Sequence, residues 1–213
     1  MINLIIIAPP AAGKGTQCKL LKDKYNYEHL STGNILRQIA GEKTEIGKKI
    51  ADLIDKGIFV SDATIIDLIQ EKRKETKHPL IFDGIPRTLT QAQALDKTSL
   101  LRDNDYVVIN IELDNDQGRN RILGRRICPS CEETYNTQEL TDDKCLKCQS
   151  SLKTREDDTL DIYEIRYKYY QEKTIPVLEF YREKGKLYTI DGTKSTEEIF
   201  QTIEKIIKEV NHD

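Results

Sequence analysis

Short runs of consecutive apolar residues alternate along this chain with longer segments in which apolar residues recur every three or four positions. A short continuous apolar run is typical of a strand buried on both faces of a parallel sheet, and the longer spacing is typical of a helix with one buried face. We predict strands at 4–7, 80–83, 106–113 and 187–190. Because strands alternate with helices, the pattern favours an α/β fold whose parallel sheet is covered on both sides.

Helices are expected over 16–24, over 62–74, from 114 through 125, from 160 to a glycine at 185, and from a capping box at 195–198 onward. Pro176 should kink the fourth of these, because proline cannot donate the backbone hydrogen bond of a helix interior. This helix also carries a stripe of tyrosines at helical spacing, which we expect to be core packing: Tyr163, Tyr167, Tyr170 and Tyr181. Residues 31–60 are predicted to form a small helical insert.

The segment 8–16, between the first strand and the first helix, is rich in small residues and contains Gly13-Lys14-Gly15-Thr16. A strand that turns sharply into a helix leaves backbone N–H groups converging at the positive end of the helix dipole, and this arrangement suits phosphate. The lysine adds a mobile charge for the outer phosphates of a nucleotide. Ala8 stands where the general pattern has its first glycine. A plain strand, turn and helix is the alternative interpretation.

Asp83 ends the second predicted strand, and ligands of parallel sheets sit at the carboxyl ends of strands. We expect this carboxylate to hold Mg²⁺ through water, although a turn or a helix cap would use the same residue. Arg121 and Arg125 are four residues apart, which would place both on one face of a helix. Such a pair is more often a solvated surface than part of an active site.

Two C-x-x-C motifs, separated by thirteen residues, interrupt the alternation of strands and helices: Cys128 with Cys131 and Cys145 with Cys148. Four thiolates suit one tetrahedral, structural Zn²⁺, and disulfides or redox thiols are the less favoured alternatives. Cys18 lies outside this group and is expected to be a small packed residue. We predict a second insert at 124–158, which with 31–60 would project over the ligand-binding edge of the sheet.

The 213 residues carry a net charge of -3, which argues against a broadly basic surface for nucleic acid. The first residues lack the positive start of a signal peptide, and no apolar run approaches the length of a membrane span. We therefore expect a protein of the cytoplasm that binds small molecules, with neither nucleic acid nor membrane as a partner.

The chain resembles the adenylate kinases, nucleoside monophosphate kinases of the phosphate-loop fold, and in particular the type with a long zinc-binding lid. The resemblance covers nearly the whole chain and rests on ordered motifs at 13–16, 31–37, 83–88 and 124–126, the four cysteines, 155–158 with Arg166, and 191–193. It implies a five-stranded parallel sheet in the order 2-3-1-4-5 and a monomer. It also implies a core domain of 1–30, 61–123 and 159–213, a monophosphate-binding insert of 31–60 and a lid of 124–158.

Members of this family transfer a phosphoryl group reversibly from ATP to AMP, with Mg²⁺, and so balance the adenine nucleotides. The resemblance implies catalytic roles for Lys14, Arg87, Arg121, Arg125, Arg155 and Arg166. It implies ATP binding by Ala11, Ala12, Gly13, Lys14, Gly15, Thr16, Arg125, Thr134, Tyr135 and Lys194. It implies AMP binding by Thr32, Arg37, Ile58, Phe59, Val60, Gly84, Ile85, Pro86, Arg87, Gln91, Arg155 and Arg166.

Four positions depart from the family pattern. Ala8 and Ala11 replace glycines in the phosphate loop, and alanine is disfavoured if the loop needs a positive φ at position 11. Asn34 replaces an aspartate and Ile85 a phenylalanine near the expected AMP site. The alternatives are a related kinase with another acceptor or with GTP as donor, and a zinc-ribbon module for nucleic acid or protein on an inactive nucleotide fold.

Overall fold

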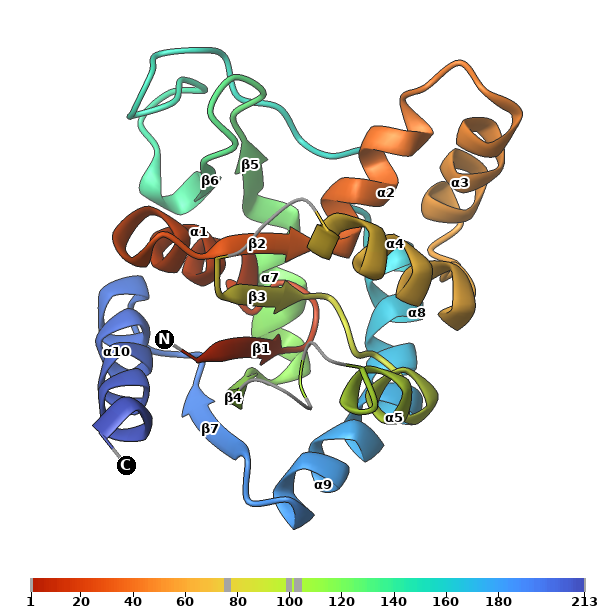
Figure 1. Cartoon of the computed structure of the whole chain (residues 1–213). Helices are drawn as coiled ribbons and strands as arrows, with labels where there is room; N and C mark the ends of the chain where they lie inside the picture. Colours follow the sequence, from red (N-terminus) through yellow and green to blue (C-terminus); the bar gives the residue numbers. More distant parts are fainter. Residues whose placement is uncertain (1, 75–77, 99–100, 102–104, 213) are drawn as a thin grey trace.

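A five-stranded parallel sheet forms the centre of the computed structural model, which describes residues 2–74, 78–98, 101 and 105–212 (Figure 1). Its strands are β1 Asn3–Ile7, β2 Glu28–Ser31, β3 Leu80–Asp83, β4 Tyr106–Glu112 and β7 Leu187–Asp191. They lie in the order β2-β3-β1-β4-β7, and each neighbouring pair is parallel. Counted along the chain this is 2-3-1-4-5, so the order implied by the resemblance is confirmed.

Strand β2 was not predicted from the apolar pattern, although the other four strands were. Its sequence, Glu-His-Leu-Ser, contains one apolar residue, and it lies at the edge of the sheet beside β3. An edge strand has one neighbour only, so it needs no continuous apolar run. The edge position therefore explains why sequence pattern alone passes over it.

Helices cover both faces of the sheet, as predicted. The core helices are α1 Lys14–Tyr25, α4 Asp62–Lys74, α5 Leu89–Asp96, α7 Asn115–Gly124, α8 Leu160–Tyr169, α9 Ile175–Glu183 and α10 Thr196–His212. One core cluster joins the sheet to α1 and α10, and the other joins it to α4, α5 and α9. Cys18 is fully buried in the first cluster, which confirms its packing role. Helix α5 was not predicted.

Two predictions about helices need correction. Helix α7 ends at Gly124, and Arg125 is the first residue of a strand, so Arg121 and Arg125 do not share a helical face. The long helix after the lid is not simply kinked at Pro176. A π-helical turn, Tyr170–Thr174, separates α8 from α9 and precedes that proline. This wider turn accommodates the missing proline N–H and the bulk of its ring.

The tyrosine stripe of α8, the π turn and α9 is only partly core. Tyr163 and Tyr181 are buried, as expected. Tyr170 is half-buried and lines the large cavity described below, as Tyr163 also does. The helical spacing found the packed residues but could not show that this side of the helix also borders a cavity.

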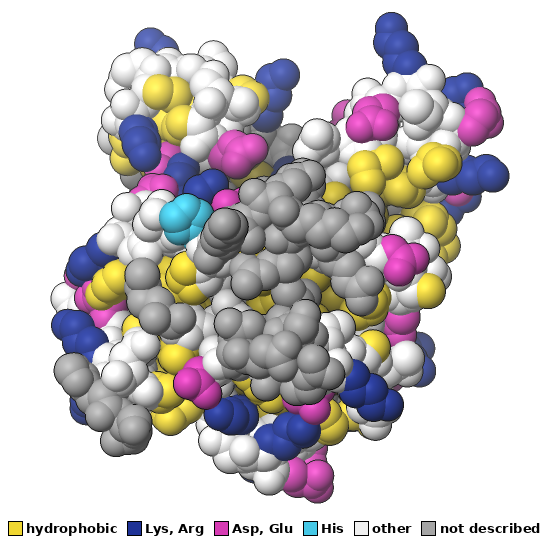
Figure 2. Space-filling model, viewed as in Figure 1, with side chains coloured by type: hydrophobic (Ala, Val, Ile, Leu, Met, Phe, Trp, Pro, Cys, Tyr) yellow, Lys and Arg dark blue, Asp and Glu magenta, His cyan; other side chains and the backbone are white. Residues whose placement is uncertain are grey.

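Two lobes rise above the core (Figure 1). The insert consists of α2 Thr32–Ala40 and α3 Glu45–Asp55, at the top right of the view. The lid contains β5 Arg125–Ile127, β6 Thr134–Asn136 and the short helix η1 Thr137–Glu139, at the top left. The space-filling view shows the two lobes separated by a gap (Figure 2). Within the described residues, no helix combines the length and apolar character needed to cross a membrane.

Candidate active site

A cavity of about 1010 Å³ lies where the core, the insert and the lid meet. Every predicted catalytic residue and every predicted ATP-binding residue contributes to its lining. All the predicted AMP-binding residues except Ile85 do so as well. Ile85 is 1% exposed and packs in the second core cluster, so it does not line the cavity. The tertiary structure thus brings together residues that are spread from position 11 to position 194.

The phosphate loop reaches the cavity in a backbone conformation that glycine favours. Ala11 has φ 63° and Gly13 has φ 82°, so both lie in the left-handed region. The glycine is the N-cap of α1, whose first residue is Lys14. The helix N-terminus and the loop therefore point their backbone N–H groups at the cavity, where they can bind phosphate. The concern raised by the sequence about alanine at position 11 is borne out by this positive φ.

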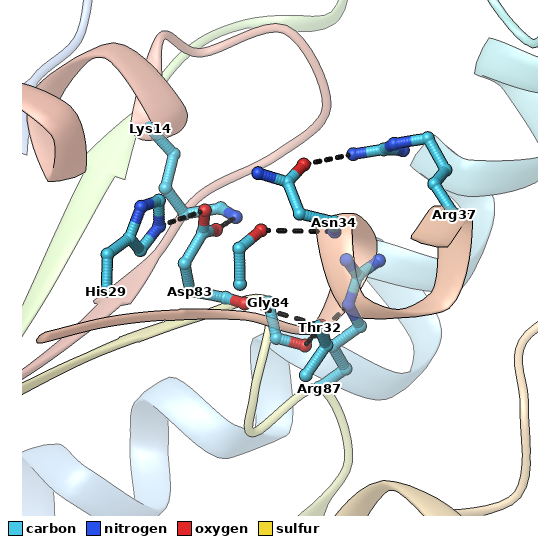
Figure 3. Close-up of polar contacts among 9 residues, drawn as sticks. Lys14, His29, Thr32, Asn34, Arg37, Asp83, Gly84 and Arg87 are labelled. Carbon is cyan, nitrogen blue, oxygen red and sulfur yellow. Dashed lines mark hydrogen bonds and ion pairs between the residues drawn. The ribbon is translucent and has the colours of Figure 1, made fainter. Parts of the chain in front are cut away.

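Asp83, at the end of β3, joins the phosphate loop to the neighbouring strand (Figure 3). One of its oxygens accepts a hydrogen bond from the Lys14 ammonium, and the other lies 2.9 Å from Nε2 of His29, on β2. Burial would raise the pKa of Asp83, but the lysine charge and the histidine hydrogen bond hold it far below its ordinary value. The carboxylate is therefore ionised and fixed in place.

His29 is a site residue that sequence reasoning missed, because it lies on the unpredicted edge strand. Its ring nitrogen, the Asp83 carboxylate and the Cys18 thiol come within 4.8 Å of one another. Both carboxylate oxygens already have partners, however, and the thiol is buried. We therefore assign no metal that His29, Asp83 and Cys18 would coordinate together.

Another part of the cavity is built around the turn after β3. Nε of Arg87 donates to the Gly84 carbonyl oxygen at 2.8 Å, and Oγ1 of Thr32 donates to the same oxygen at 3.1 Å (Figure 3). Gly84 has φ 81°, and a Cβ there would lie 2.6 Å from the threonine hydroxyl. Arg37 donates to Asn34 Oδ1 at 2.9 Å. The departure at position 34 therefore still leaves an acceptor for this arginine.

Gln91 is held in one orientation by its neighbours. Its Nε2 donates to Asp62 at 2.7 Å, and its Oε1 accepts from the backbone N–H of Arg87, also at 2.7 Å. The other oxygen of Asp62 accepts from Thr88 Oγ1 at 2.8 Å. The sequence analysis predicted a site role for Gln91 but not for Asp62. The position of Asp62 at the start of α4 does not indicate this contact.

Two buried aspartates hold two of the arginines that line the cavity. Arg125 Nε donates to Asp158 at 2.7 Å, and Arg166 donates to Asp157 at 2.6 Å. Burial would raise the pKa of Asp157, but the Arg166 charge outweighs this effect and lowers it. The sequence analysis assigned these aspartates no role of their own, although they lie two and three residues after Arg155.

Arg155 differs from Arg125 and Arg166 in its hydrogen bonding. Its guanidinium donates no hydrogen bond within the part of the chain that the structure describes, and it lines the cavity. Burial lowers the pKa of Arg155 to about 10, and the like charges of Arg125 and Arg37 act in the same direction. Asp158 and Asp157 offset part of this effect, but a half-buried guanidinium that donates no hydrogen bond to a described group is still suited to bind an anion in this corner of the cavity.

The four lid cysteines form a compact cluster, with all four sulfur atoms within 4.8 Å of one another. Individual Sγ–Sγ distances include 3.4 Å, 3.5 Å and 3.6 Å. Tetrahedral zinc with Zn–S bonds of about 2.3 Å places its sulfurs about 3.8 Å apart, so the cluster fits a structural Zn²⁺. The Tyr135 hydroxyl lies 3.3 Å from Cys145 Sγ, which connects this cluster to the cavity lining.

Comparisons with known proteins identify relatives along nearly the whole chain. The family model described as adenylate kinase matches residues 6–186. An adenylate kinase of Archaeoglobus fulgidus is 38% identical over 98% of this chain and 99% of its own length. An adenylate kinase of Fervidobacterium nodosum is 39% identical over 97% of each chain, and one of Thermosipho africanus is 36% identical over 97% of this chain and its own full length. The chain therefore belongs to the adenylate kinase family.

Proposed function

We propose that this chain catalyses the reversible, Mg²⁺-dependent transfer of the terminal phosphoryl group of ATP to AMP, which yields two ADP. One observation carries the proposal: six basic side chains from the core and the lid line a single cavity at the mouth of the phosphate loop. They are Lys14, Arg87, Arg121, Arg125, Arg155 and Arg166. We extend the proposal to the three-part division inferred from the sequence, a core with an insert at 31–60 and a lid at 124–158.

The chemistry of the reaction explains why this site needs positive charge more than a base. A phosphoryl group in transfer spreads negative charge over its three equatorial oxygens. The attacking phosphate of AMP is already ionised, so a strong general base has little to do. Fixed guanidinium groups and backbone N–H groups instead stabilise the developing charge and align the two nucleotides.

On the donor side, we propose that the phosphate loop, Ala11–Thr16, wraps the ATP phosphates. Lys14 exchanges its partner Asp83 for the outer phosphates when ATP binds, because a phosphate carries more charge than one carboxylate. Four side chains complete this side: Arg125, Thr134, Tyr135 and Lys194.

On the acceptor side, we propose that Arg37, Arg87, Arg155 and Arg166 bind the AMP phosphate and the transferred group. Thr32, Gln91, the segment 58–60, Gly84 and Pro86 form the remainder of the AMP site. Gln91 faces the base with an amide whose direction Asp62 and the Arg87 backbone already fix. A fixed amide costs less conformational entropy on binding than a free one.

Mg²⁺ bound with ATP supplies charge neutralisation between the phosphates. Asp83 suits it, because an ionised carboxylate at this strand end can hold magnesium through water. Lys14 must leave this carboxylate for that role, and the same movement takes its ammonium to the phosphates. The residue pair thus serves both the empty and the loaded site.

Zn²⁺ bound to Cys128, Cys131, Cys145 and Cys148 would have a structural role, because four thiolates leave no position for water. The lid is too small to form a core of its own: its buried cluster contains Cys128, Cys145 and Leu152. A metal gives such a segment the rigidity that it needs to close over the site and exclude water, the competing phosphoryl acceptor.

The proposal is tested by mixing the purified protein with ATP, AMP and Mg²⁺ and following ADP. The same assay with GTP as donor, and with GMP, CMP and UMP as acceptors, examines base preference. We expect ATP with AMP to have the highest kcat/KM. A preference for another pair would assign the protein to a related monophosphate kinase, and absence of turnover with every pair would refute the proposal.

A further inference from the structure

An aromatic stack joins the end of the insert to the core. The rings of Phe59 and Tyr169 lie 3.8 Å apart between centroids, at an interplanar angle of 27°. Phe59 belongs to the segment that leads from α3 to α4, and Tyr169 is the last residue of α8. Both rings are half-buried, and both line the cavity. The stack therefore lies at the base of the insert, on the acceptor side.

Arg87 lies against the same stack. Its guanidinium carbon is 4.9 Å from the centroid of Phe59, which places the positive charge over an aromatic ring. Burial and the charge of Asp62 raise the pKa of the Tyr169 hydroxyl above its ordinary value. The charge of Arg87 acts in the opposite direction and offsets part of this rise. Three side chains from separate segments therefore meet at one point.

The backbone ties these segments together. Thr174, in the π-helical turn that directly follows Tyr169, donates a 2.9 Å hydrogen bond to the Arg87 carbonyl oxygen. The Arg87 side chain is held on another side by its 2.8 Å bond to the Gly84 carbonyl oxygen. The contact with the Phe59 ring and the bond to the Gly84 carbonyl oxygen therefore restrict the directions in which the Arg87 side chain can point.

We propose that Tyr169 is a positioning residue for the acceptor: it holds the Phe59 ring in place, and the ring in turn holds the Arg87 guanidinium in the direction that the acceptor phosphate requires. This inference rests on the proposed function, which assigns Arg87 to the monophosphate. Tyr169 acts through its ring face and not through its hydroxyl. The effect is specific to the acceptor, since no residue of the phosphate loop takes part in the stack.

The test compares three substitutions at one position. Tyr169→Phe keeps the ring and serves as the matched control, Tyr169→Leu keeps apolar bulk without a ring face, and Tyr169→Ala removes both. We expect the KM for AMP to rise about tenfold in the Leu and Ala variants, the combined loss of one stack and one cation–ring contact. The KM for ATP should stay within about twofold of the wild-type value in all three variants. The KM for AMP should do so in Tyr169→Phe.

Binding of AMP measured by calorimetry should weaken in parallel, which separates positioning from a change in the chemical step. The double variant Phe59→Ala with Tyr169→Ala should bind AMP no more weakly than Phe59→Ala alone, because Tyr169 acts through that ring. Urea unfolding of each variant shows whether loss of fold contributes.

Three results would overturn the inference. A wild-type KM for AMP in Tyr169→Leu would reduce the residue to bulk packing, and equal changes for ATP and AMP would make its effect nonspecific. A lower KM for AMP in Tyr169→Ala would mean that the stack restrains the insert and does not align Arg87. All three results are compatible with normal turnover of ATP and AMP by the wild-type protein. If the proposed function is wrong, the wild-type protein itself shows no such turnover.

Discussion

Lys19, on the helix that follows the phosphate loop, donates a 2.7 Å hydrogen bond to the backbone oxygen of Cys131 in the first cysteine pair of the lid. Its ammonium also lies 2.8 Å from the Glu133 carboxylate, which pairs with Lys147 at 3.2 Å. The residues lie more than a hundred positions apart in the chain. The end of the lid that carries the four cysteines is thus attached directly to the helix whose N-terminus lines the cavity.

Replacement of Lys19 by methionine should loosen this attachment. The variant keeps most of the side-chain stem but loses the hydrogen bond and ion pair, which are partly exposed and worth about 1 kcal/mol together. We expect backbone amides of 128–148 to exchange with deuterium up to about fivefold faster, while those of β1 and β4 are unchanged. Lys48→Met, which removes an exposed pair within α3, is the matched control. Equal exchange in the two variants would show that Lys19 does not restrain the lid.

Ala11→Gly should stabilise the protein. An L-residue in the left-handed region destabilises the fold by roughly 1–2 kcal/mol, and glycine removes this strain. Glycine also makes the unfolded chain more flexible, which offsets part of the stabilisation. With φ 63° at position 11, the net gain should be up to about 1 kcal/mol in urea unfolding. Ala12→Gly is the control, because φ at position 12 is not positive, and we expect it to lose stability. A loss of stability in both variants would argue against strain at Ala11.

Arg155→Ala should separate activity from stability. The side chain makes no hydrogen bond to a described residue, and the like charges of Arg125 and Arg37 oppose the attraction of Asp158 and Asp157. The free energy of unfolding should therefore change by less than about 0.5 kcal/mol or increase. Turnover should fall at least about 100-fold, because a charge aimed at the transferred group is lost. Arg155→Lys keeps the charge without the planar fork and should be intermediate. A destabilised variant with near-normal turnover would contradict the role assigned to Arg155.

Acid should weaken the fold through Asp83 and Asp157, whose pKa values in the folded protein lie below those of an unfolded chain. A depressed carboxylate contributes its stability above the unfolded pKa, about 3.9, and loses that contribution as the pH falls through the folded value. Stability should therefore decline as the pH drops below about 4. Asp157→Asn should show a shallower decline over the same range, measured by urea unfolding at each pH. Parallel curves for the two proteins would rule out a contribution from this residue.

Removal of the metal should lower the melting temperature of the lid more than it changes the chemistry. A zinc chelator in excess Mg²⁺ removes the cation from the four thiolates but leaves the nucleotide site supplied. We expect a lower first transition in calorimetry and retained turnover below that temperature. The purified protein should hold one zinc per chain, and Cys18→Ala should hold the same amount because Cys18 lies outside the lid cluster. Complete loss of turnover with unchanged melting would contradict a structural role.

Much of this architecture could be predicted from local sequence. The strands at 4–7 and 80–83 and the helix at 62–74 agree with the structure because their apolar spacing reports the side that must be buried. The helix starts at Ser31 and Ser195 follow from short-range hydrogen bonds that the residues themselves define. The two cysteine pairs identify their cluster for a similar reason, since thiolate chemistry and spacing restrict the possible ligand.

Other features depended on contacts between distant segments, which no local pattern records. Strand β2 forms because β3 supplies a partner for its backbone, and Arg125 leaves the helix to begin the lid hairpin with β6. His29, Asp62, Asp157 and Asp158 became site residues for the same reason: each acts on a side chain that its own neighbourhood does not predict.

The chain by itself determined four of the five strands of the sheet and the core helices other than α5, which residues can carry positive charge to a phosphate, and which four thiolates can share a cation. Those properties reside in residue type and short spacing. Folding alone decided which aspartate holds which arginine, how Ala11 is forced to a positive φ, and that Tyr169 meets Phe59 beside Arg87. Such pairings are set by the packing of whole elements, because burial forces each charge and ring to take the partner that the neighbouring segment provides.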